Sequence, residues 1–225
     1  MTLPCDADPP QGAPNADFLV SVASPVTVGP NRTEIRDDPA HFAGHFARHS
    51  AIALSGMVDP LLLSRLLQIC DRAQFLTDTM TDVARRQREI PPIAGGALAL
   101  ALKRPELLRW LEQVTGRGPL QSTFGRVMQN VAGGAHHLNW HDDLPEDRTR
   151  RLAITINMGA MPYEGGLFEL RVKKTRRILA RHRHETPGSA LIFNVSDELE
   201  HRVWPITDGG PRRIFAGWFL AGDAV

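Results

Sequence analysis

The run Ile214-Phe215-Ala216-Gly217-Trp218-Phe219-Leu220, close to the end of the chain, decides the fold class. Successive side chains of a strand point to opposite faces, and here both faces are apolar, as in a strand buried inside a sheet. From this run back to residue 120, the chain is a series of short apolar segments separated by Gly, Pro and Asp clusters, which is typical of an all-β structure. We predict strands over 123–130, 137–142, 151–158, 167–172, 176–181, 189–194, 200–204 and 212–220, and this number and spacing favour a jelly roll.

The sequence before residue 119 has a different, helical pattern. Residues 51–58 are interpreted as a strand or an extended lead-in. Asp59 and Pro60 then supply a helix N-cap and a first helical residue, and apolar residues follow at helical spacing. We predict helices over 60–76, over 93–103 and from Pro105 to near Gly116. The predicted fold is therefore mainly β with N-terminal helices: a double-stranded β-helix (a cupin-like jelly roll) braced by helices.

The first fifth of the chain is rich in proline, with Asp, Asn and Gly between the prolines. We predict an extended or partly disordered arm over 1–50, in which residues 18–22 could form a short edge strand. The helical support region is predicted over 51–118 and the β core over 119–225. A chain of 225 residues suits one domain overall.

Composition excludes several classes of protein. Lys and Arg number 26 against 25 Asp and Glu, so the formal net charge is +1, which argues against a dedicated nucleic-acid binder. No apolar run is long enough to span a bilayer, and the first residues lack the features of a secretory signal. The two cysteines, Cys5 and Cys70, are interpreted as reduced thiols. We expect a cytoplasmic protein without nucleic-acid or membrane partners.

The stretch Asn139-Trp140-His141-Asp142-Asp143 carries the first sign of chemistry. His141 and Asp143 are two residues apart, so at a strand end they face the same side and could hold one cation. His201, on a distant predicted strand, is the natural candidate for a third ligand. Two histidines and one carboxylate on one face leave coordination positions open, which is the ligand set of non-haem Fe(II) oxygenases.

The open positions of such a site must take a bidentate co-substrate and O2, and a further group must bind the far carboxylate of that co-substrate. The planar guanidinium of an arginine suits this contact better than a lysine does. Arg212 begins the final strand and shares a face with Ile214, Ala216 and Trp218, whereas Arg213 points the other way. We therefore favour Arg212, with Arg213 as the fallback.

Several motifs follow one another in an order that carries a family resemblance: Asn139-Trp140-His141-Asp142-Asp143, Tyr163-Glu164-Gly165-Gly166-Leu167-Phe168-Glu169-Leu170, Pro187-Gly188-Ser189-Ala190-Leu191-Ile192-Phe193, His201-Arg202-Val203-Trp204-Pro205-Ile206-Thr207, Gly210-Pro211-Arg212-Arg213 and Gly217-Trp218. With them, residues 120–221 resemble the Fe(II)/2-oxoglutarate-dependent dioxygenases, in particular the prolyl 4-hydroxylase-like branch. The resemblance implies that His141, Asp143 and His201 bind Fe(II) and that Arg212 binds 2-oxoglutarate. It also implies O2 as co-substrate and hydroxylation of an unactivated C–H bond, with release of succinate and CO2.

Some positions depart from the family pattern. The family often has a tyrosine on the strand before the His-x-Asp motif that helps to hold 2-oxoglutarate, and that strand offers Arg126, Met128 and Asn130 here instead. Asn139 could hydrogen-bond 2-oxoglutarate or substrate, or serve a structural role. His136 and His137 could line the mouth of the substrate site, but solvated loop residues are the favoured interpretation.

The expected substrate is a small molecule, such as an amino acid or another metabolite. A residue in a protein substrate is the alternative, and a cupin-like metal protein that uses the same triad without 2-oxoglutarate turnover is a rival. The strongly basic segment Arg171-Val172-Lys173-Lys174-Thr175-Arg176-Arg177 could dock an acidic partner such as a carrier protein. A solvated hairpin is the favoured interpretation of that segment.

Overall fold

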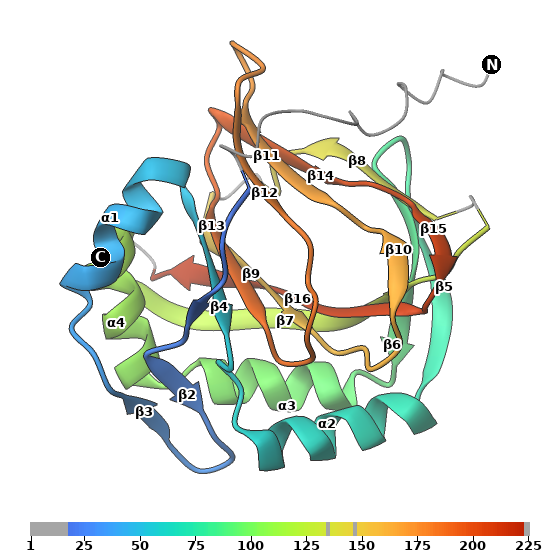
Figure 1. Ribbon diagram of the computed structural model, residues 1–225, viewed down its shortest axis with the longest axis horizontal. Coiled ribbons are helices and arrows are strands. Elements are labelled where there is room, and N and C mark those ends of the chain that lie inside the picture. Colours follow the sequence, from blue (N-terminus) through green and yellow to red (C-terminus); the bar gives the residue numbers. More distant parts are fainter. Residues whose placement is uncertain (1–17, 134–135, 146–147, 223–225) are drawn as a thin grey trace.

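A computed structural model describes residues 18–133, 136–145 and 148–222. In these residues, twelve strands form one strongly curled sheet, with helices packed against one of its faces (Figure 1). Along its main path the strand order is β1-β4-β13-β9-β16-β7-β6-β8-β14-β11-β12, and β5 pairs with β6. The predicted fold class, a helix-braced jelly roll, is confirmed.

Every strand predicted after residue 119 is present. The structure has β7 (Leu120–Asn130), β8 (His137–His141), β9 (Arg150–Asn157), β11 (Phe168–Val172), β12 (Ile178–His182), β13 (Ala190–Asn194), β14 (Leu199–Val203) and β16 (Arg212–Ala221). Two short strands that were not predicted, β10 (Tyr163–Gly165) and β15 (Ile206–Gly209), pair with each other. The long central strand β16 lies between β9 and β7, so the apolar run over 214–220 belongs to an interior strand, as its two apolar faces predict.

The helices are α1 (Ala40–His49), α2 (Pro60–Arg72), α3 (Ile93–Leu102) and α4 (Pro105–Thr115). Helix α2 begins as expected, because the Asp59 carboxylate accepts hydrogen bonds from the backbone N–H groups of Leu61 and Leu62. It ends earlier than predicted, and the chain continues into a hairpin of β5 (Gln74–Met80) and β6 (Ala84–Ile90). Most side chains of β5 are exposed, so the apolar alternation that would signal a strand is absent.

The described part of the predicted N-terminal arm is folded onto the body. It forms β1 (Val22–Ala23), β2 (Val26–Val28), β3 (Thr33–Ile35) and α1, before the predicted strand β4 (Ala51–Ser55). Val26 and Val28 are completely buried. Burial of these two apolar side chains stabilises the folded segment. The proline-rich composition by itself gives no sign of this burial. Residues 1–17 of the predicted arm lie outside the described residues.

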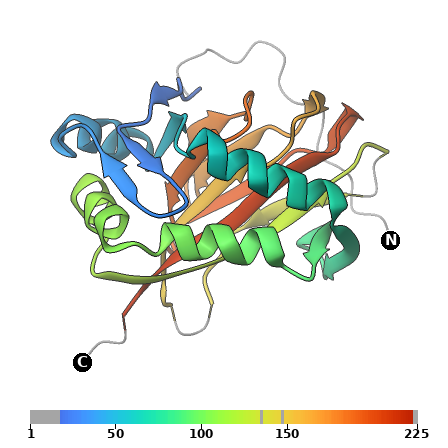
Figure 2. The same ribbon diagram turned by 90° about the horizontal axis from the view of Figure 1, so that it is seen from below.

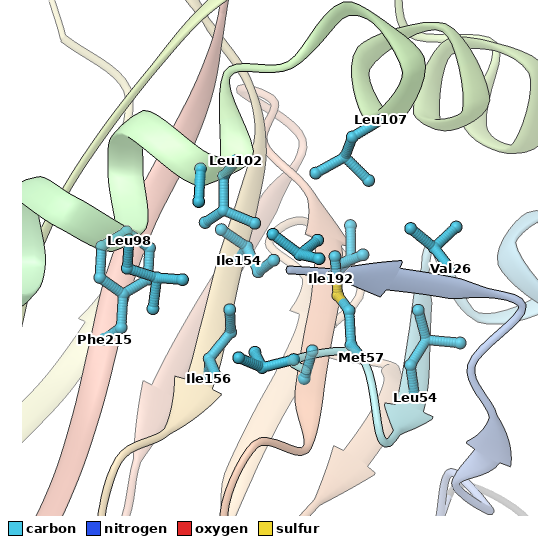
Figure 3. Close-up of a cluster of buried hydrophobic side chains, with 14 of the residues drawn as sticks. Val26, Leu54, Met57, Leu98, Leu102, Leu107, Ile154, Ile156, Ile192 and Phe215 are labelled. Carbon is cyan, nitrogen blue, oxygen red and sulfur yellow. The ribbon is translucent and has the colours of Figure 1, made fainter. Parts of the chain in front are cut away.

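The largest hydrophobic core lies between the helices and the outer face of the sheet. Helices α2 and α3 run side by side across that face (Figure 2). Leu98 and Leu102 of α3 point towards Ile154, Ile156 and Phe215 of the sheet (Figure 3). Packing here is close: a Cβ atom added at Gly125 would lie 2.2 Å from the Phe215 ring, so only glycine fits.

Alternation along β16 separates this core from a cavity on the opposite, concave face of the sheet. Phe215 and Phe219 are fully buried in the helix-covered core. Arg212, Ile214 and Trp218, at the intervening positions, line the cavity. One strand therefore supplies both the wall of the core and the floor of the cavity.

None of the helices in the described part of the chain combines the length and the apolar character needed to cross a bilayer.

Candidate metal centre and its cavity

The pairing of β8 with β14 brings two of the predicted ligands together. The strands are antiparallel, and His141 and His201 are direct partners in the register. Their ring centroids are 4.1 Å apart. Asp143 follows β8 by two residues and has a φ of +61°, a left-handed conformation in which aspartate is among the more tolerant residues. This turn keeps its carboxylate beside the two imidazoles.

The ligand atoms of His141, Asp143 and His201 all lie within 4.8 Å of one another. The Asp143 carboxylate is 3.2 Å from His141 Nε2 and 3.6 Å from His201 Nε2. Two imidazole nitrogens and one carboxylate oxygen converging from one side suit a divalent transition metal such as Fe(II). The three residues chosen from the sequence thus form the one group of this kind found in the described residues.

Neighbouring groups fix the orientation of these side chains. His141 Nδ1 lies 2.7 Å from the Asn139 carbonyl oxygen, so it donates to that oxygen and leaves Nε2 free to bind a cation. The Trp218 indole N–H donates to Asp143 Oδ2 at 2.9 Å. Phe193 packs on His201 with ring centroids 4.7 Å apart. A triad held in this way needs little rearrangement when it binds a metal.

The electrostatics of the triad favour ionised carboxylate. Burial raises the pKa of Asp143, but the charges and hydrogen bonds of His201, His141 and Trp218 outweigh burial and hold the pKa below its usual value. Burial lowers the pKa of His201 to about 3, so this imidazole is neutral near pH 7. A neutral imidazole and an ionised carboxylate are the forms that bind metals.

Arg212 lies in the same cavity as the triad, at the start of β16. It is only 7% exposed, and its Nε has no hydrogen-bond partner. Its side chain lies beside Tyr163, and burial lowers its pKa. Among the described residues, no carboxylate forms an ion pair with it. A buried guanidinium without an anion is costly, and this one fits the far carboxylate of 2-oxoglutarate.

Arg213 occupies the opposite face of β16. Its Nε donates to Gln129 at 2.8 Å, and its guanidinium forms an ion pair with Asp71 of α2 at 2.5 Å. The strand alternation used to choose between the two arginines therefore describes their positions correctly. Of the two, only Arg212 lines the cavity that holds the triad.

The structure does not bring the other two predicted binding residues into the cavity. Asn139 is exposed, and its amide donates to the Asp82 carbonyl at 3.0 Å. Arg126 lies on the concave face of β7, but its guanidinium carbon is 5.3 Å from the centre of the Phe124 ring and the residue does not line the cavity wall. Neither placement shows a contact with the predicted 2-oxoglutarate site.

Two cavity residues were misjudged from the sequence, and a neighbour of Arg212 was missed. His136 and His137, interpreted as solvated loop residues, both line the cavity. His136 is buried and its Nδ1 accepts a hydrogen bond from the backbone N–H of Val131. Tyr163, in the Gly-Gly segment, contacts Arg212. A Cβ at Gly166, where φ is +66°, would lie 3.1 Å from Arg212 Cδ, so glycine permits this close approach. No local pattern signals a contact between segments so far apart in the chain.

The basic hairpin between β11 and β12 is partly neutralised. Arg171 pairs with Glu200 at 2.7 Å, and Lys173 pairs with Asp142 at 2.5 Å. Lys174 and Arg176, at the tip, are exposed.

Two buried histidines lie behind Arg212. His184 bridges Thr155 and Ser189, with 2.9 Å between each hydroxyl and a ring nitrogen. The ring of His182 packs edge-on against His184, with centroids 4.8 Å apart. Burial, together with the charge of Arg212, lowers the pKa of His182 to about 4. Both rings are therefore neutral near pH 7, because burial also lowers the pKa of His184.

This burial predicts a pH-dependent stability. The pKa of His182 is lower in the folded protein than in the unfolded chain. Its contribution to the unfolding free energy is therefore complete above about pH 6.5 and is lost as pH falls towards 4. We expect His182 to account for about 2 kcal/mol of the unfolding free energy lost between pH 7 and pH 5. Urea unfolding of His182→Gln at the two pH values should show a smaller loss than the unaltered protein. The exposed His45→Gln variant serves as control, and equal losses in the unaltered protein and His182→Gln would contradict the prediction.

Comparison with known proteins agrees with this geometry. Residues 126–220 match the sequence profile of the 2OG-Fe(II) oxygenase superfamily. No curated protein matches the chain significantly in sequence. The fold is similar to that of a Pseudomonas putida prolyl-4-hydroxylase, with a TM-score of 0.61 and 19% identity over 82% of this chain and 100% of the other.

Two further solved structures share the fold. One is a prolyl hydroxylase from Trichoplax adhaerens in complex with a hypoxia inducible factor peptide fragment; its TM-score is 0.60, at 11% identity over 81% of this chain and 88% of the other. The second is a non-heme alpha-ketoglutarate-dependent epimerase from nogalamycin biosynthesis, with a TM-score of 0.57 at 11% identity, covering 82% and 84%. The same architecture thus occurs with a peptide bound and in the biosynthesis of a small molecule.

Proposed function

We propose that this chain, of which residues 126–220 match the profile of the 2OG-Fe(II) oxygenase superfamily, is a 2-oxoglutarate-dependent dioxygenase that hydroxylates an unactivated C–H bond of a small molecule. The observation that carries the proposal is the convergence of His141, Asp143, His201 and Arg212 on one cavity. Apolar and polar side chains line this cavity, part of which is open to solvent.

In the proposed reaction, the residues of the chain bind and orient. His141, Asp143 and His201 hold Fe(II), while Trp218 keeps the Asp143 carboxylate in place through its N–H. Arg212 binds the far carboxylate of 2-oxoglutarate, and Tyr163 supports the guanidinium. When bound, Fe(II), 2-oxoglutarate and O2 together supply the oxidant: one oxygen atom enters the substrate and the other enters succinate, with loss of CO2.

The cavity walls position the C–H bond and limit access of water. Apolar Phe168 and Phe193 flank His201, with ring centroids 5.6 and 4.7 Å away. His136 and His137 line the same cavity and supply polar contacts for the substrate. Aromatic walls with a few polar groups are typical of small-molecule sites.

A specific observation favours the alternative, hydroxylation of a residue in a peptide. Two of the structures with this fold are prolyl hydroxylases, and one of them holds a peptide fragment. Proteins that share a fold at this level of sequence identity can act on different substrates. The substrate of this chain must therefore be identified by experiment.

The proposal is tested by supplying the protein with Fe(II), O2 and 2-oxoglutarate and measuring succinate. We expect slow succinate release without further substrate, and faster release with a subset of free amino acids or carrier-bound acyl groups. Acceleration by peptides alone would favour the alternative. A complete lack of succinate with iron present would instead favour a cupin-like metal protein.

A further inference from the structure

Three arginines gather on the concave face of neighbouring strands, on the side of the cavity away from Arg212. Arg86 of β6 lines the cavity itself. Arg88, two residues on, is the register partner of Met128, and Met128 also lines the cavity. Arg126 of β7 is the register partner of Ala216, which is on the same face. We call Arg86, Arg88 and Arg126 the arginine strip.

The strip lies beside the metal triad but apart from the 2-oxoglutarate site. The order of neighbouring strands is β16-β7-β6-β8-β14, with Arg212 on β16 and the triad histidines on β8 and β14. Strand β6, which carries Arg86 and Arg88, is thus two strands from Arg212, or roughly 10 Å at the usual spacing. Arg86 lines the same cavity as His141 and His201. A substrate opposite the metal would therefore reach the strip while Arg212 holds the co-substrate.

The strip carries more positive charge than its surroundings balance. Asp78 of β5 is its one carboxylate partner in the described residues, at 3.5 Å from Arg86 Nε and 3.9 Å from Arg88 Nε. Arg126 has no ion pair there and contacts the Phe124 ring. Glu89 lies close by, but its two oxygens accept hydrogen bonds from the backbone N–H groups of α3 at 2.7 and 2.9 Å.

One polar atom of the strip lacks a hydrogen bond. Arg88 Nε is buried and donates to no acceptor among the described residues, since Asp78, its ion-pair partner, is 3.9 Å away. Arg88 and Arg126 also line a second depression that adjoins the strip. A donor without an acceptor, among guanidiniums that share one carboxylate, favours an anionic ligand, because an oxyanion accepts two parallel N–H hydrogen bonds from one guanidinium.

We propose that the arginine strip binds a carboxylate or phosphate group of the substrate and places the rest of that molecule against the metal triad. This inference rests on the proposed function and narrows it: the substrate is an acid. Arg86 is the central contact because it lies in the cavity with the triad, and Asp78 holds it in position until the anion arrives.

The experiment uses protein loaded with Fe(II) and saturating 2-oxoglutarate under nitrogen, so that Arg212 is occupied. Calorimetric titration compares acetyl-glutamic acid amide with its neutral glutamine counterpart, and phosphoserine amide with serine amide. We expect at least one acid to bind about tenfold more tightly than its neutral partner. A difference between the glutamic acid and glutamine compounds would identify the anion as a carboxylate. A difference between phosphoserine amide and serine amide would identify it as a phosphate.

Variants connect this difference to the strip. Arg86→Gln should remove most of the preference for the acid, and Arg86→Lys should restore part of it. Asp78→Asn should strengthen acid binding, because a competing carboxylate is lost. Arg109→Gln is the control: it removes the same charge from an exposed position on helix α4, outside the cavity, and it should leave the preference unchanged within about twofold.

Three results would overturn the proposal: equal binding of acids and neutral partners, no binding of any acid, or equal effects of Arg109→Gln and Arg86→Gln. Succinate release without substrate, measured on the same preparations, separates the two hypotheses. If it persists while acid binding is absent, only the assignment of the strip is wrong. If succinate release is absent as well, the proposed function has failed.

Discussion

His141→Ala is expected to abolish stoichiometric Fe(II) binding and, with it, succinate release. The variant removes one of three ligand atoms that lie within 4.8 Å of one another, and the two that remain cannot hold the metal on one face. Loss of a residue that hydrogen-bonds to a metal ligand lowers metal affinity by roughly 10- to 100-fold. Loss of the ligand itself should lower the affinity further. Iron bound after anaerobic dialysis is the measurement.

The control for this prediction is His45→Ala, which removes an exposed imidazole on α1, outside the cavity. It should retain the iron content of the unaltered protein. Near-UV circular dichroism of both variants establishes that the fold is intact. Full iron occupancy in His141→Ala would show that the ligands have been wrongly assigned.

Arg212→Ala is expected to weaken 2-oxoglutarate binding by about 100-fold or more, because the far carboxylate would enter a buried site without its cation. Arg212 is 7% exposed and has no carboxylate partner among the described residues, so nothing nearby can replace it. Calorimetry of 2-oxoglutarate binding to the Fe(II) form under nitrogen measures the change. Arg212→Lys should recover part of the affinity, since a lysine keeps the charge but not the bidentate geometry.

Arg213→Ala is the matched control, because it removes the same side chain from the next residue. Arg213 pairs with Asp71, whose side chain is 70% exposed, so its loss should cost stability of about 1 kcal/mol or less. The 2-oxoglutarate dissociation constant should stay within about twofold. If Arg213→Ala impairs 2-oxoglutarate binding and Arg212→Ala does not, the co-substrate lies elsewhere.

The β core was predictable because its signals are local. Each strand after residue 119 has its own apolar run and its own turn residues, and all eight predicted strands are present. The hairpin β5–β6 gave no such signal, because its side chains are mostly polar and partly exposed. It was therefore predicted in part as the end of a helix. Yet this hairpin carries Arg86, the residue on which the identity of the substrate depends in our proposal.

The residues of the candidate site were likewise predictable only where the signal is local. His141 and Asp143 share a side because of a two-residue spacing that any reader of the sequence can see. The role suggested for Asn139 came from the face that it shares with His141, and the role for Arg126 came from the family's tyrosine on the preceding strand. The structure places both side chains outside the cavity wall. Spacing gives the face of a strand but not the direction that a long side chain takes once its neighbours are in place.

By itself, the sequence predicted eight strands after residue 119, the shared side of His141 and Asp143, and the face of β16 on which Arg212 lies. Each of these follows from alternation or spacing within a few residues. The tertiary structure decided the register that sets His201 opposite His141, the approach of Tyr163 to Arg212, and the gathering of three arginines beside the triad. These contacts join segments that are remote in the chain, and their geometry arises only when the sheet curls and its strands pair.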